Sequence, residues 1–212
     1  MYEQEKKEIL ITAKKLMACG LIKLTTGNLS MRCGKHIIFT PSGMDYNDCN
    51  IDDMVVLDMK GNKVEGSRTA SKEKDGCLYI FEHMPEVNAI IHTHQVYATT
   101  VGLITDKLPA ILTTQASACG GEVKVAPYAP AGSIETGIFA VENLKGKRAV
   151  ILKHHGVTVV GKDLNEALHS AIYLEEASEA YLAARAICEP PVLEDWQIQK
   201  ALEIYKDYLV KK

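Results

Sequence analysis

The chain has 212 residues, 47% hydrophobic and 24% charged, a composition typical of a globular domain and unlike that of a disordered chain. Its 24 basic and 27 acidic residues give a net charge of −3, which argues against nucleic acid as the main partner. No apolar run approaches the roughly 18 residues of a membrane span, and residues 1–8 lack the apolar core of a secretory signal. The six cysteines contain no Cys-x-x-Cys pair and indicate reduced thiols. We therefore expect one cytoplasmic domain spanning residues 1–212, without a membrane partner.

Hydrophobic periodicity and turn residues predict a mixture of helices and strands without a strict alternation. In chain order we expect a helix at residues 3–19, a loop at 24–30, strands at 35–40, 54–59 and 63–65, a helix at 71–82, a strand at 87–92, a helix at 96–104, a strand at 110–114, a helix at 134–144, strands at 149–153 and 157–160, and helices at 164–188 and 195–209. This mixture predicts an α/β fold, a helix–sheet–helix sandwich with hairpins in the sheet.

Three histidines are candidate metal ligands. His92 and His94 lie two positions apart at the end of a predicted strand, where alternation puts both side chains on one face. His155, in the turn His154-His155-Gly156, follows another strand. Together they could form a three-nitrogen site that leaves positions open for substrate, as catalytic zinc sites do. The alternative is that these are ordinary surface and core histidines.

Glu73 is the candidate carboxylate partner. Near such a site it could complete the metal coordination or move a proton. The alternative is a solvated glutamate in the first turn of a helix, where the helix dipole favours negative charge.

Three turns are suited to bind an oxyanion. Thr26-Gly27-Asn28 and Thr40-Pro41-Ser42-Gly43 offer hydroxyls and backbone N–H groups, and Ser71-Lys72 begins a predicted helix. Each could equally be an ordinary turn, but one of them adjoins Glu73.

Seven short motifs occur in a recognisable order. They are Gly27-Asn28, Thr40-Pro41-Ser42-Gly43, Ser71-Lys72-Glu73, His92-Thr93-His94, Gly120-Gly121, Ala126-Pro127-Tyr128 and His154-His155-Gly156. The ordered set resembles the class II aldolase/adducin family, and within it most the L-fuculose-1-phosphate aldolases. The likeness extends from the first helix to Tyr208.

The resemblance implies a three-layer αβα sandwich around a largely antiparallel sheet, assembled as a homotetramer with the site between subunits. It implies a zinc-dependent cleavage of a ketose 1-phosphate, such as L-fuculose 1-phosphate, to dihydroxyacetone phosphate and an aldehyde. By this resemblance His92, His94 and His155 bind one Zn²⁺ per subunit, and Glu73 touches the metal and serves as acid/base. Tyr208 handles a proton on the aldehyde side of a neighbouring site. The implied phosphate-binding residues are Gly27, Asn28, Ser42, Gly43, Ser71 and Lys72.

The chain departs from the fuculose enzymes at several positions. Lys72 replaces a serine of their Ser-Ser-Glu motif, and the residues after Glu73, Lys74-Asp75-Gly76, differ from the usual apolar run. Two aromatic residues around the aldehyde are missing, and their positions correspond most nearly to Thr113 and Ala131. These changes leave the metal and acid/base residues in place but leave the sugar open.

Other activities are compatible with the same family. L-ribulose-5-phosphate 4-epimerases rejoin the fragments, but their pattern carries Asp where Glu73 stands. Methylthioribulose-1-phosphate dehydratases share the three-histidine site and eliminate water. A non-catalytic, adducin-like scaffold module would lose metal ligands, whereas this chain keeps them.

Overall fold

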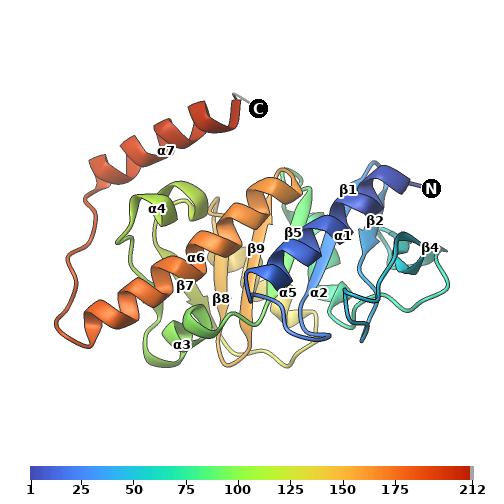
Figure 1. Cartoon of the computed structure of the whole chain (residues 1–212), viewed down its shortest axis with the longest axis horizontal. Coiled ribbons are helices and arrows are strands. Elements are labelled where there is room, and N and C mark those ends of the chain that lie inside the picture. Colours follow the sequence, from blue (N-terminus) through green and yellow to red (C-terminus); the bar gives the residue numbers. More distant parts are fainter. Residues whose placement is uncertain (211–212) are drawn as a thin grey trace.

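The computed structural model describes the backbone of residues 1–210 and the side chains through residue 206. A nine-stranded sheet runs through the molecule in the order β4-β3-β2-β1-β5-β9-β8-β7-β6 (Figure 1). Its strands are β1 (Asn28–Cys33), β2 (His36–Phe39), β3 (Val55–Asp58), β4 (Lys63–Glu65), β5 (Ala89–Thr93), β6 (Lys107–Leu108), β7 (Val123–Ala126), β8 (Ala149–Leu152) and β9 (Gly156–Gly161).

The sheet is mixed. Strands β7 and β8 pair in parallel, and the other neighbours pair antiparallel. The parallel pair follows from the connection between these strands, which crosses over through a helix and so forms a βαβ unit. The expected α/β architecture is therefore present, whereas the expected largely antiparallel sheet is confirmed only in part.

Helices cover both faces of the sheet. On one face lie α1 (Glu3–Ala18), α3 (Val96–Ile104) and α6 (Leu164–Arg185), and on the other lie α2 (Lys74–His83) and α5 (Glu135–Leu144) (Figure 1). Helix α4 (Thr113–Cys119) packs against both α6 and α7 (Asp195–Val210). Within the part of the chain that is described, no helix combines the length and apolarity needed to cross a bilayer.

The alternating residues of the central strands build two separate cores. Ile90 and Val150 belong to the core under α2 and α5, whereas Ile91 and Ile151 belong to the core under α1, α3 and α6. This is the pattern that a strand buried on both faces requires. The consequence for the site is that the central strands, packed on both faces, support the groups at their ends.

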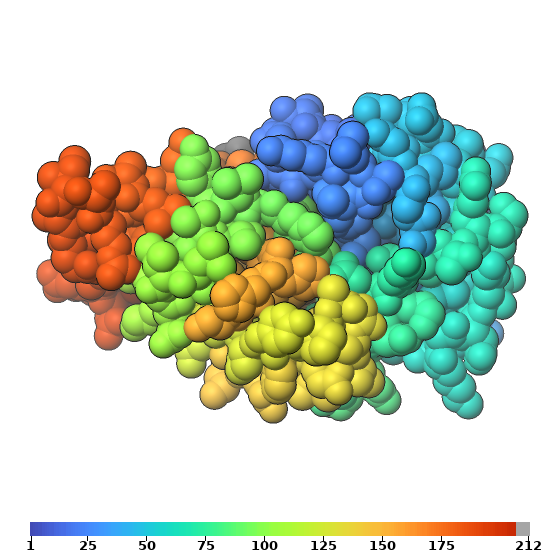
Figure 2. All heavy atoms as spheres, turned by 90° about the horizontal axis from the view of Figure 1, so that it is seen from below, coloured from blue at the N-terminus to red at the C-terminus, as the bar shows by residue number. Residues whose placement is uncertain are grey.

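The C-terminal segment lies at one end of an elongated molecule. In Figure 2 its red atoms stand beside the green residues around α3 and α4, far from the teal residues at the opposite end. A loop after α6 leads to α7, and Leu193 in this loop donates its backbone N–H to the Ala110 carbonyl at 2.8 Å.

The loop predicted at residues 24–30 ends early, because strand β1, which was not predicted, begins at Asn28. A second predicted element is wrong. Residues 110–114 were expected to form a strand, but residues 109–112 are irregular and helix α4 begins at Thr113. The buried amide of Gln115 explains the difference, because it accepts from Ile111 N–H at 3.1 Å and donates to the Pro109 carbonyl at 3.1 Å. These bonds occupy backbone groups that a strand would need for its neighbours.

Candidate active site

The three central strands β1, β5 and β9 bring the candidate metal ligands together. His92 belongs to β5, His94 follows that strand by one residue, and His155 directly precedes β9. Strand β5 pairs with both neighbours, so that His92 lies opposite Asn28 of β1 and Thr158 of β9. Residues far apart in sequence thus meet at the same end of these central strands.

The three imidazoles converge with Glu73. Their ligand atoms all lie within 4.8 Å of one another, and the Nε2 atoms of His92 and His94 are 3.0 Å apart. Glu73, which precedes α2, places Oε2 at 3.2 Å from His92 Nε2 and Oε1 at 3.2 Å from His155 Nε2. The sequence expectation that alternation directs His92 and His94 to one face agrees with this geometry.

The tautomer of His92 makes this cluster suitable for a metal ion. Its Nδ1 lies 2.9 Å from the Val157 carbonyl, which can only accept, so the proton of the neutral ring sits on Nδ1. The lone pair on Nε2 then faces the other imidazoles and a Glu73 oxygen, which is itself an acceptor. Such an arrangement of converging acceptors calls for a cation between them, and a carbonyl fixing the outer nitrogen is usual for a metal-bound histidine.

Burial and neighbouring charges shift the pKa values of the residues in the cluster. Burial lowers the pKa of His92 to about 4, although Glu73 opposes the shift, so this ring is neutral at pH 7. Burial also lowers the pKa of His94, helped by the neighbouring His155. Burial opposes ionisation of Glu73, but the hydrogen bond with His155 and the adjacent histidines outweigh it, and the pKa of this carboxyl lies well below its usual range. The site therefore holds the Glu73 carboxylate beside the neutral ring of His92.

Asn28 holds Glu73 in this position. Its buried amide donates from Nδ2 to Glu73 Oε2 at 2.7 Å, and its Oδ1 accepts from the Cys77 thiol at 3.8 Å. Asn28 was expected among the phosphate-binding residues, and the structure directs its side chain to the carboxylate instead.

Two glycines at the site lie so close to neighbouring atoms that a side chain would not fit. A Cβ on Gly156 would clash with the Thr93 carbonyl and lie 2.9 Å from the His94 ring, so only glycine lets that ring sit beside β9. Gly27 has a φ of +74°, and a Cβ there would lie 2.7 Å from the His92 carbonyl. These contacts explain why glycines occur in both motifs.

A cavity of about 310 Å³ opens in front of Glu73. Its walls combine the ligands His94 and His155 with the three turns expected to bind an oxyanion. The predicted site residues that line it are Gly27, Ser42, Gly43, Ser71, Lys72, Glu73, His94, Ala131 and His155. The geometry can thus bring an anionic group of a ligand and the metal cluster into one cavity.

Thr25 and Gly132 also line this cavity and were not singled out from the sequence. Gly132 has a φ of +81°, and a Cβ there would lie 3.2 Å from the Lys72 carbonyl. The turn Ala131-Gly132-Ser133 was the available signal, because glycine with a positive φ is common where a loop approaches another backbone.

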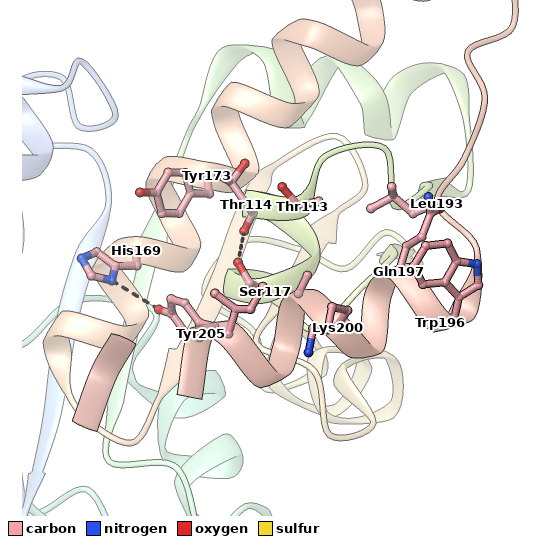
Figure 3. A pocket seen from close by; sticks show the side chains of 12 residues that line it. Thr113, Thr114, Ser117, His169, Tyr173, Leu193, Trp196, Gln197, Lys200 and Tyr205 are labelled. Carbon is pink, nitrogen blue, oxygen red and sulfur yellow. Dashed lines mark hydrogen bonds between the residues drawn. The ribbon is translucent and has the colours of Figure 1, made fainter. Parts of the chain in front are cut away.

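Thr113 and Ala131, the two candidate aldehyde residues, lie in different cavities. Thr113 lines a cavity of about 520 Å³ between α4 and α7, together with Tyr173, Trp196 and Tyr205 (Figure 3). Ala131 lines the cavity beside Glu73. Within one subunit the structure does not bring these residues together. Tyr208 lies on α7, and its side chain is outside the described residues.

The comparison with protein families identifies the class of protein. A model described as class II aldolase and adducin N-terminal domain matches residues 7–182. The chain therefore belongs to the class II aldolase and adducin family, and it is an enzyme, a lyase of the class II aldolase type. Class II aldolases depend on a metal ion, and the His92, His94 and His155 group is one that could bind it.

Individual relatives extend the likeness over nearly the whole chain. The 5-methylthioribulose-1-phosphate/5-deoxyribulose-1-phosphate aldolase of Rhodospirillum rubrum is 32% identical over 200 residues, 94% of this chain and 90% of that protein. The L-fuculose phosphate aldolase of Escherichia coli is 32% identical over 203 residues, 95% of this chain and 94% of that protein. A solved structure of an L-fuculose 1-phosphate aldolase superposes with a TM-score of 0.90 at 34% identity, covering 95% of each chain.

Proposed function

We propose that this protein is a zinc-dependent class II aldolase that cleaves a deoxyketose 1-phosphate to dihydroxyacetone phosphate and an aldehyde. One observation carries the proposal. The Glu73 carboxylate touches His92 and His155 and lines a cavity whose other walls are the three oxyanion-suited turns. A sugar phosphate can therefore present its anionic end to the turns and its reacting carbons to Glu73.

His92, His94 and His155 would hold one Zn²⁺ per subunit. Neutral imidazole is a preferred zinc ligand, and three protein nitrogens leave positions for substrate oxygens. The chemistry that a bound ion supplies here is Lewis-acid stabilisation of the negative charge that develops on the sugar oxygens during cleavage.

The proposed phosphate cradle consists of Gly27, Ser42, Gly43, Ser71 and Lys72. Serine hydroxyls and backbone N–H groups in turns suit phosphate oxygens, and the exposed ammonium of Lys72 adds a positive charge. Asn28 would support this site indirectly, by keeping Glu73 Oε2 at 2.7 Å from its amide.

Glu73 would exchange the proton at C3 of the dihydroxyacetone phosphate fragment. Its carboxylate has the low pKa of a base that is ionised at rest, and its position beside the cavity puts it within reach of a bound sugar. Tyr208 of a second subunit would handle the proton on the aldehyde oxygen.

The proposed substrate is a ketose 1-phosphate without a hydroxyl at its far end, such as L-fuculose 1-phosphate or a 5-deoxypentulose 1-phosphate. Support comes from the names of the relatives and from the small side chains of Thr113 and Ala131, which leave room for an apolar aldehyde. Their separation in two cavities supports a site shared by two copies, and we propose a homotetramer that acts in the cytoplasm.

The test is synthesis in the reverse direction. The zinc-loaded protein is incubated with dihydroxyacetone phosphate and L-lactaldehyde, acetaldehyde or glycolaldehyde, and products are identified by mass. We expect formation of a ketose 1-phosphate, which should stop when a chelator is added and resume when zinc is restored.

Glu73→Gln is the matched control. It keeps the shape of the side chain, so the variant should retain its metal while turnover falls by roughly 10²–10⁴, as expected for loss of a general acid/base. Wild-type protein that forms no product with any aldehyde would contradict the proposal and favour the epimerase or dehydratase activity.

A further inference from the structure

A second, much smaller cavity lies behind Glu73, on the side of the sheet covered by α2 and α5. It measures about 20 Å³ and is separate from the cavity in front of the carboxylate. Its lining includes Glu73, Cys77 of α2, Thr136 of α5 and Thr158 of β9, with Ile80 and Leu152 as apolar walls. A polar lining at this place is unusual, because the surrounding core under α2 and α5 is built from apolar side chains.

The cavity exists because two helices cross at glycines. A Cβ on Gly76 would lie 2.5 Å from Thr136 Oγ1, and one on Gly137 would lie 2.8 Å from the Gly76 Cα. Glycines at these positions therefore let α2 and α5 approach closely while no side chain fills the space beside the carboxylate.

Thr158 is only 6% exposed and lines this cavity, and its hydroxyl makes no side-chain hydrogen bond to another described residue. A hydroxyl that lines a cavity and has no protein partner is a suitable partner for a bound water molecule. The other polar groups of the lining keep acceptor capacity. Thr136 donates its hydroxyl proton to the Ser133 carbonyl at 2.7 Å and can still accept, and each Glu73 oxygen has further lone pairs.

We propose that this cavity binds one ordered water molecule, which donates a hydrogen bond to the Glu73 carboxylate from behind, and that Thr158 is the positioning residue for that water. A cavity needs only about 10–15 Å³ and two to four polar partners to hold a water molecule, and this one offers both. The water accepts from Thr158 and donates to Glu73, with Thr136 as a further acceptor.

This water gives Glu73 a defined resting place. Asn28 holds the carboxylate from the β1 side at 2.7 Å, and the water would hold it from the α2–α5 side. With both partners the carboxylate keeps one orientation toward the substrate cavity. The role in turnover rests on the proposed aldolase function, but the water site itself does not.

The test uses crystals of the full-length protein prepared without metal and with zinc. Difference density for one water molecule is expected between Glu73 and Thr158 in the wild type and in Thr158→Ser, and its loss is expected in Thr158→Val, which has the same shape without the hydroxyl. Wild-type density that shows other buried waters but none here would overturn the proposal.

Kinetics give an independent readout of positioning. Loss of one hydrogen bond to the carboxylate should lower kcat about fivefold in Thr158→Val, with KM for the sugar phosphate and zinc content unchanged and Thr158→Ser restored toward wild type. The matched control is Thr99→Val, which removes a buried, unpartnered hydroxyl on α3, away from the cavity, and should leave kcat unchanged. An unchanged kcat in Thr158→Val would contradict the positioning role of Thr158.

A wild-type protein without aldolase activity would contradict the proposed function. The crystallographic test of the water site would still be valid in that case.

Discussion

The side chain of His92 combines two properties that together determine the behaviour of the site. Burial keeps its ring neutral, with a pKa of about 4, and the Val157 carbonyl fixes the proton on Nδ1. The lone pair on Nε2 is therefore available at physiological pH without first losing a proton. A metal ion would compete with fewer protons here than at an exposed histidine.

His155→Ala should remove the metal from the protein, because three nitrogens that lie within 4.8 Å of one another would become two. Metal content is measured by atomic absorption after gel filtration. The matched control is the exposed neighbour His154, whose φ of +59° suits asparagine, so that His154→Asn should keep its metal. Full metal occupancy in His155→Ala would contradict the ligand assignment.

The metal-free protein should lose stability as the pH is lowered from about 6.5 toward 4. In this range the unfolded chain takes up a proton at the position of His92 and the folded chain does not, because the folded pKa is about 4. Stability should fall by up to about 1.4 kcal/mol per pH unit for that proton and level off at higher pH. The lowered pKa of Glu73 extends the loss to more acidic pH.

Urea unfolding of chelator-treated protein between pH 4.5 and 7.5 checks this expectation. His92→Asn should flatten the dependence, because it removes the buried group that resists protonation. A wild-type profile that is flat across this range would show that His92 has an ordinary pKa in the folded protein.

At the scale of elements, the turn after His94 is held by a side chain from a different helix. Glu175 of α6 accepts from the backbone N–H groups of Tyr97 at 3.0 Å and Ala98 at 2.9 Å, at the start of α3. The buried amide of Gln95 donates to the Ala171 carbonyl at 2.9 Å. Helix α3 has no capping side chain of its own at this end, so α6 supplies the acceptor.

Glu175→Ala should destabilise the protein by roughly 1–3 kcal/mol, because it leaves N–H donors at the start of α3 without an acceptor. The matched control is Glu176→Ala, which removes the same side chain from an exposed position on the same helix and should be nearly neutral. Unfolding free energies from denaturant titrations compare the two. Equal values for both variants would contradict the capping role.

Some helices and strands that are specified by the local sequence agree well with the sequence-based predictions. Helix α3 has the predicted bounds, 96–104, and strand β4 has the predicted bounds, 63–65. Helix α4 was missed because its end depends on Arg148, which donates to the carbonyls of Ala118 and Ser117 from 30 residues away. Strands β1, β6 and β7 were also missed, since each pairs with a strand that is distant in the sequence.

The same distinction applies to the candidate site. His92, His94, His155 and Glu73 could be selected from the sequence because the motifs that contain them, taken in order, resemble those of a known family, and the fold brings them together. Thr158 could not be selected, because a threonine in a strand is ordinary and the cavity that it lines forms only when α2 and α5 are in place.

At the scale of the whole molecule, the separation of Thr113 from Ala131 implies that one copy does not complete the proposed aldehyde site. Co-expressed Glu73→Gln and Tyr208→Phe subunits should therefore recover activity that neither variant has alone. If each site takes Glu73 from one subunit and Tyr208 from its neighbour, random mixing should restore about a quarter of the sites.

The measurement is kcat of the purified mixed oligomer, with each variant expressed alone as the control and light scattering to give the mass. Activity no higher than the mean of the two variants would place Glu73 and Tyr208 in the same subunit's site, or remove Tyr208 from the reaction.

The distance between the two cavities also bears on how the substrate range of such an enzyme can change. The groups proposed for the phosphate-bearing half belong to turns anchored on the central strands, whereas Thr113 belongs to a short helix packed against the C-terminal segment. Random variation confined to α4, α7 and the loop at Ala131 can then alter which aldehyde the enzyme accepts. Binding and activation of the dihydroxyacetone phosphate donor are preserved. The chain is for this reason a practical starting point for libraries that form carbon–carbon bonds between one constant donor and many acceptors.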